Sequence, residues 1–158
     1  MKALDGKIAL VTGASKGIGA AIATAFGAAG ARVVVNYRQD EPGAVDVVSD
    51  IHTLGSEGLA VQADISRETD VERLFETAEA HFGTPDIVVN NAGQFHHGEF
   101  GALSLLEMQQ QINVNLLGTL LVCQQAARRF PARGGCIINL SALNSQQSTP
   151  GSVLWAAT

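Results

Sequence analysis

The sequence predicts an α/β fold in which one parallel β-sheet lies between two layers of helices. From residue 8 onward, short apolar runs rich in β-branched residues alternate with longer segments of helical periodicity, as expected for parallel strands joined by crossover helices. The strand candidates are almost continuously apolar, which parallel strands buried on both faces require. The chain has 158 residues, 46% of them hydrophobic, which is enough for a single domain spanning residues 1–158.

Five strands and four helices follow one another along the chain. The strands are expected at residues 8–11, 32–36, 58–63, 86–89 and 136–140, and the helices at residues 17–29, 42–54, 68–82 and 103–130. Gly30, Gly55 and Gly83 follow the first three helices, where a left-handed residue commonly ends a helix. The fourth helix is long, and we expect a break near its start.

The last stretch of the sequence predicts an incomplete sheet. The fifth strand is followed by a loop rich in Ser, Gln, Pro and Gly, and residues 152–158 have the pattern of the opening turns of a further helix. A parallel sheet that stops at this point leaves apolar surface and an open strand edge exposed. We therefore expect a fold that is truncated after its fifth strand, or one that a partner completes.

Charge and cysteine content exclude several classes of function. The formal net charge is -5 and the basic residues form no stripe, so no nucleic-acid partner is expected. Cys123 and Cys136 lie in apolar runs without a paired spacing, which predicts buried, reduced thiols rather than a disulfide or a metal site, and a cytoplasmic location. No apolar run approaches the roughly 20 residues of a membrane span, so no membrane partner is expected.

A glycine-rich segment directly after the first strand predicts a phosphate site. Residues 12–19 read Thr-Gly-Ala-Ser-Lys-Gly-Ile-Gly and open the first helix. Glycines let the backbone approach a ligand closely, and the free N–H groups and dipole of a helix start attract an anion. A turn made only for tight packing between strand and helix is the alternative. We assign Gly13, Ser15, Lys16, Gly17, Ile18 and Gly19 to the binding of a dinucleotide pyrophosphate.

Four blocks of the sequence together resemble the short-chain dehydrogenase/reductase family. Residues 12–19 are similar to its TGxxxGIG motif. The other three blocks are Asp64 with Ile65, similar to its adenine-side aspartate; Asn91, Ala92 and Gly93 after Asn90, similar to its NNAG motif; and Asn115, similar to the asparagine of its long helix. The resemblance runs from about Lys7 to the last residue and covers the first three-fifths or so of a typical member, such as a 3-oxoacyl reductase or a glucose dehydrogenase. It implies a doubly wound, Rossmann-type fold of three layers that binds a nicotinamide dinucleotide.

The residues after the second strand favour NADP as the cofactor. In dinucleotide folds an acidic residue at this place bonds the adenosine ribose and repels a 2′-phosphate, but here Asn36 takes it, followed by Tyr37 and Arg38. Arg38 and Lys16 are cations that could face the extra phosphate of NADP. They could also be ordinary solvated charges, and Asp40 and Glu41 nearby keep NAD possible.

The catalytic positions depart from the pattern that the resemblance implies. The family pattern has a serine after the fifth strand, a tyrosine thirteen residues later that donates a proton, a lysine four residues further, and an asparagine that holds a water relay. The asparagine is Asn115, but Ala142 and Trp155 stand at the serine and tyrosine positions, and the lysine position falls beyond Thr158. Indole has no titratable proton near neutral pH, so Trp155 cannot act as the general acid.

Other polar residues were weighed for a catalytic role. Ser141 is one position from the expected serine, and on a strand it faces the opposite side unless the strand end bulges. Ser145 and Ser148 read as turn residues, and His52 and His81 as helix surface. His96 and His97 follow the NNAG-like block and are either a proton-transfer pair or solvent-facing loop residues, without further ligands at metal spacing.

Three functions fit the sequence. The first is an NADP-dependent oxidoreductase acting on a small carbonyl or alcohol substrate by hydride transfer, in truncated or catalytically degenerate form. The second is a non-catalytic module that binds the nucleotide or a partner, and the third is an unstable remnant that binds nothing. The resemblance also implies that the long helix could pair chains into a homo-oligomer. The substrate is not predicted, because a fold resemblance does not choose one.

Overall fold

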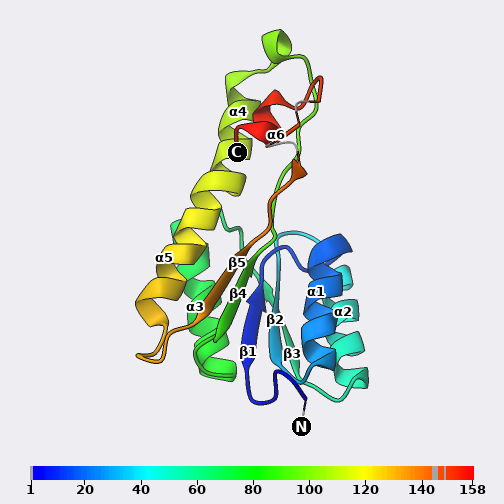
Figure 1. Cartoon of the computed structure of the whole chain (residues 1–158), viewed down its shortest axis with the longest axis vertical. Helices are drawn as coiled ribbons and strands as arrows, with labels where there is room; N and C mark the ends of the chain where they lie inside the picture. Colours follow the sequence, from blue (N-terminus) through cyan, green and yellow to red (C-terminus); the bar gives the residue numbers. More distant parts are fainter. Residues whose placement is uncertain (1, 144–145, 148) are drawn as a thin grey trace.

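A five-stranded parallel sheet forms the centre of the protein. The computed structural model describes residues 2–143, 146–147 and 149–158, and its strands lie in the order β3-β2-β1-β4-β5 (Figure 1). They are β1 (Ile8–Val11), β2 (Arg32–Tyr37), β3 (Gly58–Gln62), β4 (Ile87–Asn90) and β5 (Cys136–Asn139). The expected α/β fold is confirmed, and no predicted strand end is displaced by more than one residue.

The first three helices end where the sequence predicts. They are α1 (Gly17–Ala28), α2 (Glu41–Thr53) and α3 (Glu68–His81). Gly30, Gly55 and Gly83 follow them with φ angles of 97°, 79° and 102°. Such positive φ angles are open to glycine and strained for other residues, which is why the helices stop at these positions.

Helices cover both faces of the sheet and create two cores. In β1, Ile8 and Leu10 pack toward α3 and α5 (Thr119–Arg129). The alternate residues Ala9 and Val11 pack toward α1 and α2 on the other face (Figure 1). Successive side chains of a strand point to opposite faces, so a strand that is apolar throughout is buried on both sides. The doubly wound arrangement follows from this pattern.

The fourth predicted helix is divided differently from the expectation. A short 3-10 turn at Phe100–Ala102 precedes α4 (Leu105–Ile112), and a π-helical segment at Asn113–Gly118 then joins α4 to α5. The 3-10 turn lies before the expected range of residues 103–130, and within that range the irregularity falls at residues 113–118 rather than near the start. Ser104 fixes the start of α4 through a capping box with Glu107, which satisfies helix N–H groups that would otherwise lack partners.

Close packing accompanies the π-helical segment. A Cβ added at Gly118, its last residue, would lie 2.9 Å from Ile65 Cδ1 and 3.0 Å from the Ile65 carbonyl oxygen. Glycine thus allows the helix to approach the loop that follows β3. Asn115 belongs to the same segment, so the irregular turn carries one of the predicted site residues, as π-helical turns often do.

The edge strand β5 is less buried than expected. It pairs with β4 on one side, and only Ile137 of its four residues is partly buried while the others are exposed. Cys136 is accordingly exposed and Cys123 on α5 is half-buried, so the prediction of two buried thiols is wrong. An edge strand lacks a neighbour on one side, which leaves its side chains open to solvent.

The topology predicts where a ligand can bind. β2 and β3 lie on one side of β1, whereas β4 and β5 lie on the other. Successive strands are therefore added on one side of β1 up to β3 and on the other side from β4 onward. Ligands of open α/β sheets bind outside the carboxyl ends of the strands at such a switch point, here between β1 and β4. The loops after β1 and β4 meet there. Short helix α6 (Val153–Ala156) lies above the same end of the sheet, close to α4 (Figure 1).

Candidate functional site

The loop between β1 and α1 packs tightly against the residues that follow β4. Gly13 has a φ of 60°, and a Cβ added there would lie 2.8 Å from Ala92 Cα. A Cβ added at Gly19 would collide with Asn91 Nδ2 and lie 2.5 Å from the carbonyl oxygen of Gly13. Gly17 has a φ of 59° but no neighbour within 4 Å of an added Cβ. Two of the three glycines therefore serve close packing, and Gly17 serves the turn itself.

The start of α1 is open to an anion. Its N-cap residue, Lys16, makes no side-chain capping bond, and the first turn contains no acidic residue. The start of α2 differs, because Asp40 Oδ1 accepts a hydrogen bond from Gly43 N at 3.2 Å and Glu41 lies in the first turn. Uncapped N–H groups and the positive end of the helix dipole bind phosphate. The glycine loop thus keeps the features of a phosphate site.

Thr12 joins the two loops through its hydroxyl group. Its Oγ1 accepts hydrogen bonds from the backbone N–H groups of Asn91 at 3.1 Å and Ala92 at 3.0 Å. Asn91 Nδ2 in turn donates to the carbonyl oxygens of Thr12 and Gly13, both at 2.9 Å. Thr12 was not assigned to the site from the sequence. The sequence feature that could have identified Thr12 is a hydroxyl residue at the junction between a buried strand and the glycine motif.

A pocket with charged walls opens beside these loops. This charged pocket has a volume of about 290 Å³. Its lining includes Gly13, Ser15, Lys16, Asn36, Tyr37, Arg38, Asp64, Ile65, Asn91, Ala92 and Gly93, all of them predicted from the sequence. Gly17 and Gly19 shape the loop without lining the pocket, and Ile18 lines the neighbouring one. The additional lining residues are Gln39, Asp40, Ala63, Gln94 and Val114.

Asn36 is a buried structural residue within this wall. Its side chain is 1% exposed, and Oδ1 accepts a hydrogen bond from Gly13 N at 3.2 Å. Its Nδ2 donates to the carbonyl oxygens of Val61 at 3.3 Å and Ala63 at 3.1 Å. Asn36 therefore ties β2 to β3 and to the glycine loop. Its neighbour Tyr37 is also buried, and this burial, followed by the charge of Glu41, raises the pKa of the phenol.

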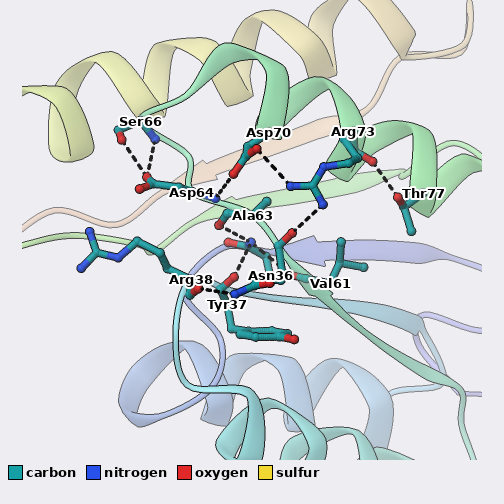
Figure 2. Close-up of polar contacts among 11 residues, drawn as sticks. Asn36, Tyr37, Arg38, Val61, Ala63, Asp64, Ser66, Asp70, Arg73 and Thr77 are labelled. Atoms are coloured by element: carbon teal, nitrogen blue, oxygen red, sulfur yellow. Dashed lines mark hydrogen bonds and ion pairs between the residues drawn. The ribbon is translucent and has the colours of Figure 1, made fainter.

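The turn between β3 and α3 places Asp64 in the lining of the charged pocket, and Figure 2 shows the polar contacts around it. Asp64 Oδ1 accepts hydrogen bonds from Ser66 N at 3.0 Å and Ser66 Oγ at 2.7 Å. Asp64 N donates to Asp70 Oδ2 at 2.9 Å, and Arg73 pairs with Asp70 Oδ1 at 3.0 Å. The bond from Asp64 N, followed by Arg73, lowers the pKa of Asp70. The turn that carries Asp64 is thus fixed by an ionised carboxylate.

A second pocket continues from the first but carries no charge. This neutral pocket has a volume of about 530 Å³ and shares Asn91, Ala92 and Gly93 with the charged pocket. Its remaining lining residues are Ile18, Asn90, Asn115, Thr119, Asn139, Leu140, Ser141, Ala142, Trp155, Ala156, Ala157 and Thr158. Among these described residues there is no Asp, Glu, His, Cys, Tyr or Lys. The pocket therefore offers hydrogen-bond donors but no side chain that releases a proton near neutral pH.

Ser141 and Ala142 both line the neutral pocket. The expectation that Ser141 faces away depended on the alternation of side chains along a strand. β5 ends at Asn139, so this alternation does not extend to Ser141, and the direction of its side chain stays a prediction. Trp155 lies in the same wall, with its ring edge-on to Phe95 at 5.4 Å between centroids.

Asn115 holds the loop after β4 in place. Its Oδ1 accepts a hydrogen bond from Gln94 N at 2.7 Å, and Nδ2 donates to the Gln94 carbonyl oxygen at 3.0 Å and to Thr158 Oγ1 at 3.1 Å. Both amide hydrogens are thereby used. Asn115 lies at the neutral pocket as expected from the resemblance, while its role in a water relay stays a prediction.

The histidines lie outside the linings of the pockets described above. His96 Nε2 contacts Glu107 Oε1 at 2.9 Å, and His96 N donates to Gln111 Oε1 at 2.8 Å. His96 therefore fastens the loop after β4 to α4. His52 and His81 are exposed on helices, as predicted. Ser145 and Ser148 lie outside the described residues.

Two further properties of the described residues concern metal ions and membranes. No three His, Cys, Asp or Glu side chains within residues 2–143, 146–147 and 149–158 are grouped so that they could hold a metal ion. None of the helices in the same ranges has the length and apolar character needed to cross a membrane.

Comparison with known proteins gives one consistent result. Residues 7–158 match the family model of the short chain dehydrogenases. An uncharacterized oxidoreductase of Methylorubrum extorquens is 41% identical over 158 residues, which are 100% of this chain and 63% of that protein. The 3beta-hydroxysteroid dehydrogenase 1 of Eggerthella lenta is 46% identical over 143 residues, 89% of this chain and 55% of the relative.

A solved structure agrees with the sequence relatives. A short chain dehydrogenase from Burkholderia cenocepacia in complex with NADP is 38% identical and superimposes with a TM-score of 0.91, covering 98% of this chain and 63% of the other. The chain thus spans about three-fifths of the length of the relatives it matches, which agrees with the extent of the resemblance noted in the sequence.

Proposed function

The chain belongs to the short-chain dehydrogenase family, and from this premise we propose that it binds NADP(H) in a catalytically degenerate form of an oxidoreductase site. The ancestral oxidoreductase site would have transferred hydride between nicotinamide and a carbonyl or alcohol. One observation carries the proposal: two adjoining pockets share the residues 91–93, yet the first is charged and the second has no titratable side chain among its described lining residues.

The glycine loop supports binding of the pyrophosphate. The open N–H groups of α1 supply hydrogen-bond donors and a positive dipole, and Gly17 leaves free space where a Cβ would project. Thr12 and Asn91 fix the loop without occupying those N–H groups. These residues fit a dinucleotide whose phosphates lie over the start of α1.

Two cations favour NADP over NAD. Lys16 and Arg38 line the charged pocket and are exposed, so their charges can face a 2′-phosphate. Asp40 opposes them less than the sequence alone suggests, because its carboxylate is engaged in capping α2 through Gly43 N. The NADP complex of the Burkholderia relative supports the same cofactor.

The neutral pocket argues against proton transfer. A bound reduced nicotinamide supplies hydride, but carbonyl reduction also needs a proton and a donor for the developing oxyanion. Ser141 and the indole of Trp155 can donate hydrogen bonds, while Ala142 offers only a methyl group. We therefore expect binding of the cofactor with no efficient reduction of a carbonyl by this chain.

A partner-binding role is the second candidate. Leu116, Leu117 and Leu120 on the long helix are 46%, 48% and 55% exposed. Exposed leucines grouped on a helix favour association with another protein surface, including a second copy of the chain. Turnover does not distinguish this role from simple nucleotide binding, but measurement of the molecular mass in solution does.

A titration tests the proposed function. Trp155 is the only tryptophan in the chain and lines the neutral pocket, so its fluorescence should fall as NADPH binds beside it. Calorimetry should give the same Kd, with NADPH bound more tightly than NADH. The variant Arg38→Gln should lose most of this preference, while Arg128→Gln, which removes an exposed arginine at the end of α5, should keep it.

Two results would overturn the proposal. A chain that unfolds cooperatively, and is therefore folded, yet binds neither nucleotide would lack the cofactor site. A chain without a cooperative transition would instead be the unstable remnant that the sequence also allows.

A further inference from the structure

We propose that Arg67, at the start of α3, binds the 2′-phosphate of NADP together with Arg38. The inference rests on the proposed function, because it adds a residue to the adenosine end of the same nucleotide site. Arg67 belongs to none of the sequence blocks that resemble the family, and it does not line the charged pocket.

An open groove connects the two arginines. This arginine groove has a volume of about 590 Å³ and is lined by Arg38, Gln39, Gln62, Asp64, Arg67, Asp70 and Arg73. It shares Arg38, Gln39 and Asp64 with the charged pocket. A 2′-phosphate held by Arg38 would therefore lie next to the groove, whose lining also includes Arg67.

One of the three arginines in the groove is already neutralised. Arg73 pairs with Asp70 Oδ1 at 3.0 Å and donates from Nη1 to the Gln62 carbonyl oxygen at 3.2 Å (Figure 2). The Asp70 carboxylate therefore offsets the charge that the Arg73 guanidinium could offer to an anionic ligand. Figure 2 also shows the Arg38 side chain extending away from Arg73.

Arg38 and Arg67 keep their guanidinium groups available. Among the described residues, neither forms an ion pair within 4.0 Å, and both are exposed. Arg67 has a long-range effect on Asp70, whose pKa is lowered first by Asp64 N, then by Arg73 and least by Arg67. Asp64 is the remaining anion in the groove, and Ser66 already donates two hydrogen bonds to its Oδ1.

The backbone of Arg67 is fixed although its side chain is free. Arg67 N donates to the Asp64 carbonyl oxygen at 3.0 Å, and the Arg67 carbonyl oxygen accepts from Asp70 N at 3.0 Å and Val71 N at 3.1 Å. The side chain therefore starts from a defined point, which reduces the entropy lost when it binds. A phosphate has three terminal oxygens, and two guanidinium groups from different loops can each donate to it in a forked geometry.

The test compares ligands with and without a 2′-phosphate. Calorimetry on the full chain would measure Kd for NADPH, NADH, adenosine 2′,5′-bisphosphate and 5′-AMP, with Arg67→Gln, Arg67→Lys and the control Arg128→Gln. We expect Arg67→Gln to weaken NADPH and the bisphosphate about fivefold, as for an exposed charge-assisted contact, and to change NADH and 5′-AMP less than about twofold. Arg67→Lys should recover part of the loss, and Arg128→Gln should resemble the unaltered chain.

Each result has a distinct meaning. Equal weakening of all four ligands, or no change in any, would overturn the role of Arg67; unchanged melting temperatures would show that the variants are folded. Binding of the bisphosphate through Arg67 without binding of either dinucleotide would overturn the proposed function and, with it, the assignment of Arg67 to NADP. Binding of NADPH that is insensitive to Arg67→Gln would overturn this inference alone and leave the proposed function standing.

Discussion

The charged pocket and the neutral pocket share one wall but differ in what builds them. The charged pocket depends on backbone groups, since the open start of α1 and the tight glycine turn are set by the chain path. The neutral pocket depends on individual side chains, and at two positions these are Ala142 and Trp155. A cofactor site made from the backbone should thus tolerate substitutions of single side chains better than a site that depends on those side chains.

Electrostatics separate the two regions further. Lys16, Arg38, Asp40 and Asp64 surround the charged pocket, whereas the described lining of the neutral pocket has no residue that is ionised near neutral pH. Affinity for an anionic dinucleotide should therefore come almost entirely from the charged side. Changes in the charged region should alter binding strongly, and changes in the neutral region should alter it little.

The largest effect is expected at Gly19, on the charged side. In Gly19→Ala the new Cβ would collide with Asn91 Nδ2 and the Gly13 carbonyl oxygen. We expect a loss of about 3 kcal/mol in the free energy of unfolding, as for overpacking of a close contact, and NADPH binding too weak to measure. Gly101→Ala is the control, because its added Cβ has no neighbour within 4 Å. Normal binding by Gly19→Ala would contradict the tight contact between the loops.

Removal of the Thr12 hydroxyl should have the next largest effect. Thr12→Val leaves the N–H groups of Asn91 and Ala92 without their acceptor, which should cost about 2 kcal/mol for buried donors. Urea unfolding measures this loss, and calorimetry should detect weaker NADPH binding as the loop loosens. Thr12→Ser keeps the hydroxyl and should stay near the original stability. A loss in Thr12→Ser with none in Thr12→Val would mean that the methyl group, and not the hydroxyl, matters.

A pH-dependent effect is expected at Asp70. Its pKa is lowered in the folded chain, chiefly by Asp64 N and then by Arg73. The carboxylate therefore stabilises the fold above the ordinary carboxyl pKa of about 3.9, and this contribution disappears as the pH falls through the lower folded-state value. Asp70→Asn should cost about 1 kcal/mol at pH values near 7.

Urea unfolding over a pH series measures the effect at Asp70. The difference between Asp70→Asn and the unaltered chain should shrink as the pH falls below the ordinary carboxyl range, because the unaltered carboxylate then becomes protonated. A difference that stays constant across the series would contradict the role of the charge. It would point instead to the shape of the side chain.

The smallest effect is expected at Trp155, on the neutral side. Trp155→Phe keeps an aromatic ring beside Phe95 and leaves the charged pocket intact, so the Kd for NADPH by calorimetry should change by less than about twofold. A loss as large as that of Arg38→Gln would show that the neutral pocket contributes much of the affinity. The contrast between the two regions would then be wrong.

The sequence predicts the glycine loop of the charged pocket, which depends on backbone groups, better than it predicts the contacts between distant side chains. The spacing of Gly13, Gly17 and Gly19 after an apolar strand identifies both the turn and its place in the sheet, because glycine geometry and strand order are local properties. The structural role of Asn36 was missed, since its partners lie on β3 and in the glycine loop. The arginine groove was missed for the same reason, as it joins residues that are distant in sequence.

The exposure of the residues in the edge strand β5 could not be predicted from the sequence pattern either. Residues 136–140 are as apolar as a buried strand, so Cys136 was expected to be buried. An apolar run does not reveal whether a strand has a neighbour on each side, and β5 pairs with β4 alone. The strand also ends at Asn139, one residue before the expected end, because strand ends are set by pairing as well as by composition.

The most direct test of the central claim is NADPH oxidation by the chain when it is saturated with NADPH and given a panel of ketones and aldehydes. Saturation is first established by the titration of Trp155 fluorescence. We predict that NADPH remains bound and is oxidised no faster than in a solution without protein, because no described side chain in the lining of the neutral pocket releases a proton near neutral pH. Carbonyl-dependent oxidation that disappears in Gly19→Ala would contradict the account and establish a working oxidoreductase.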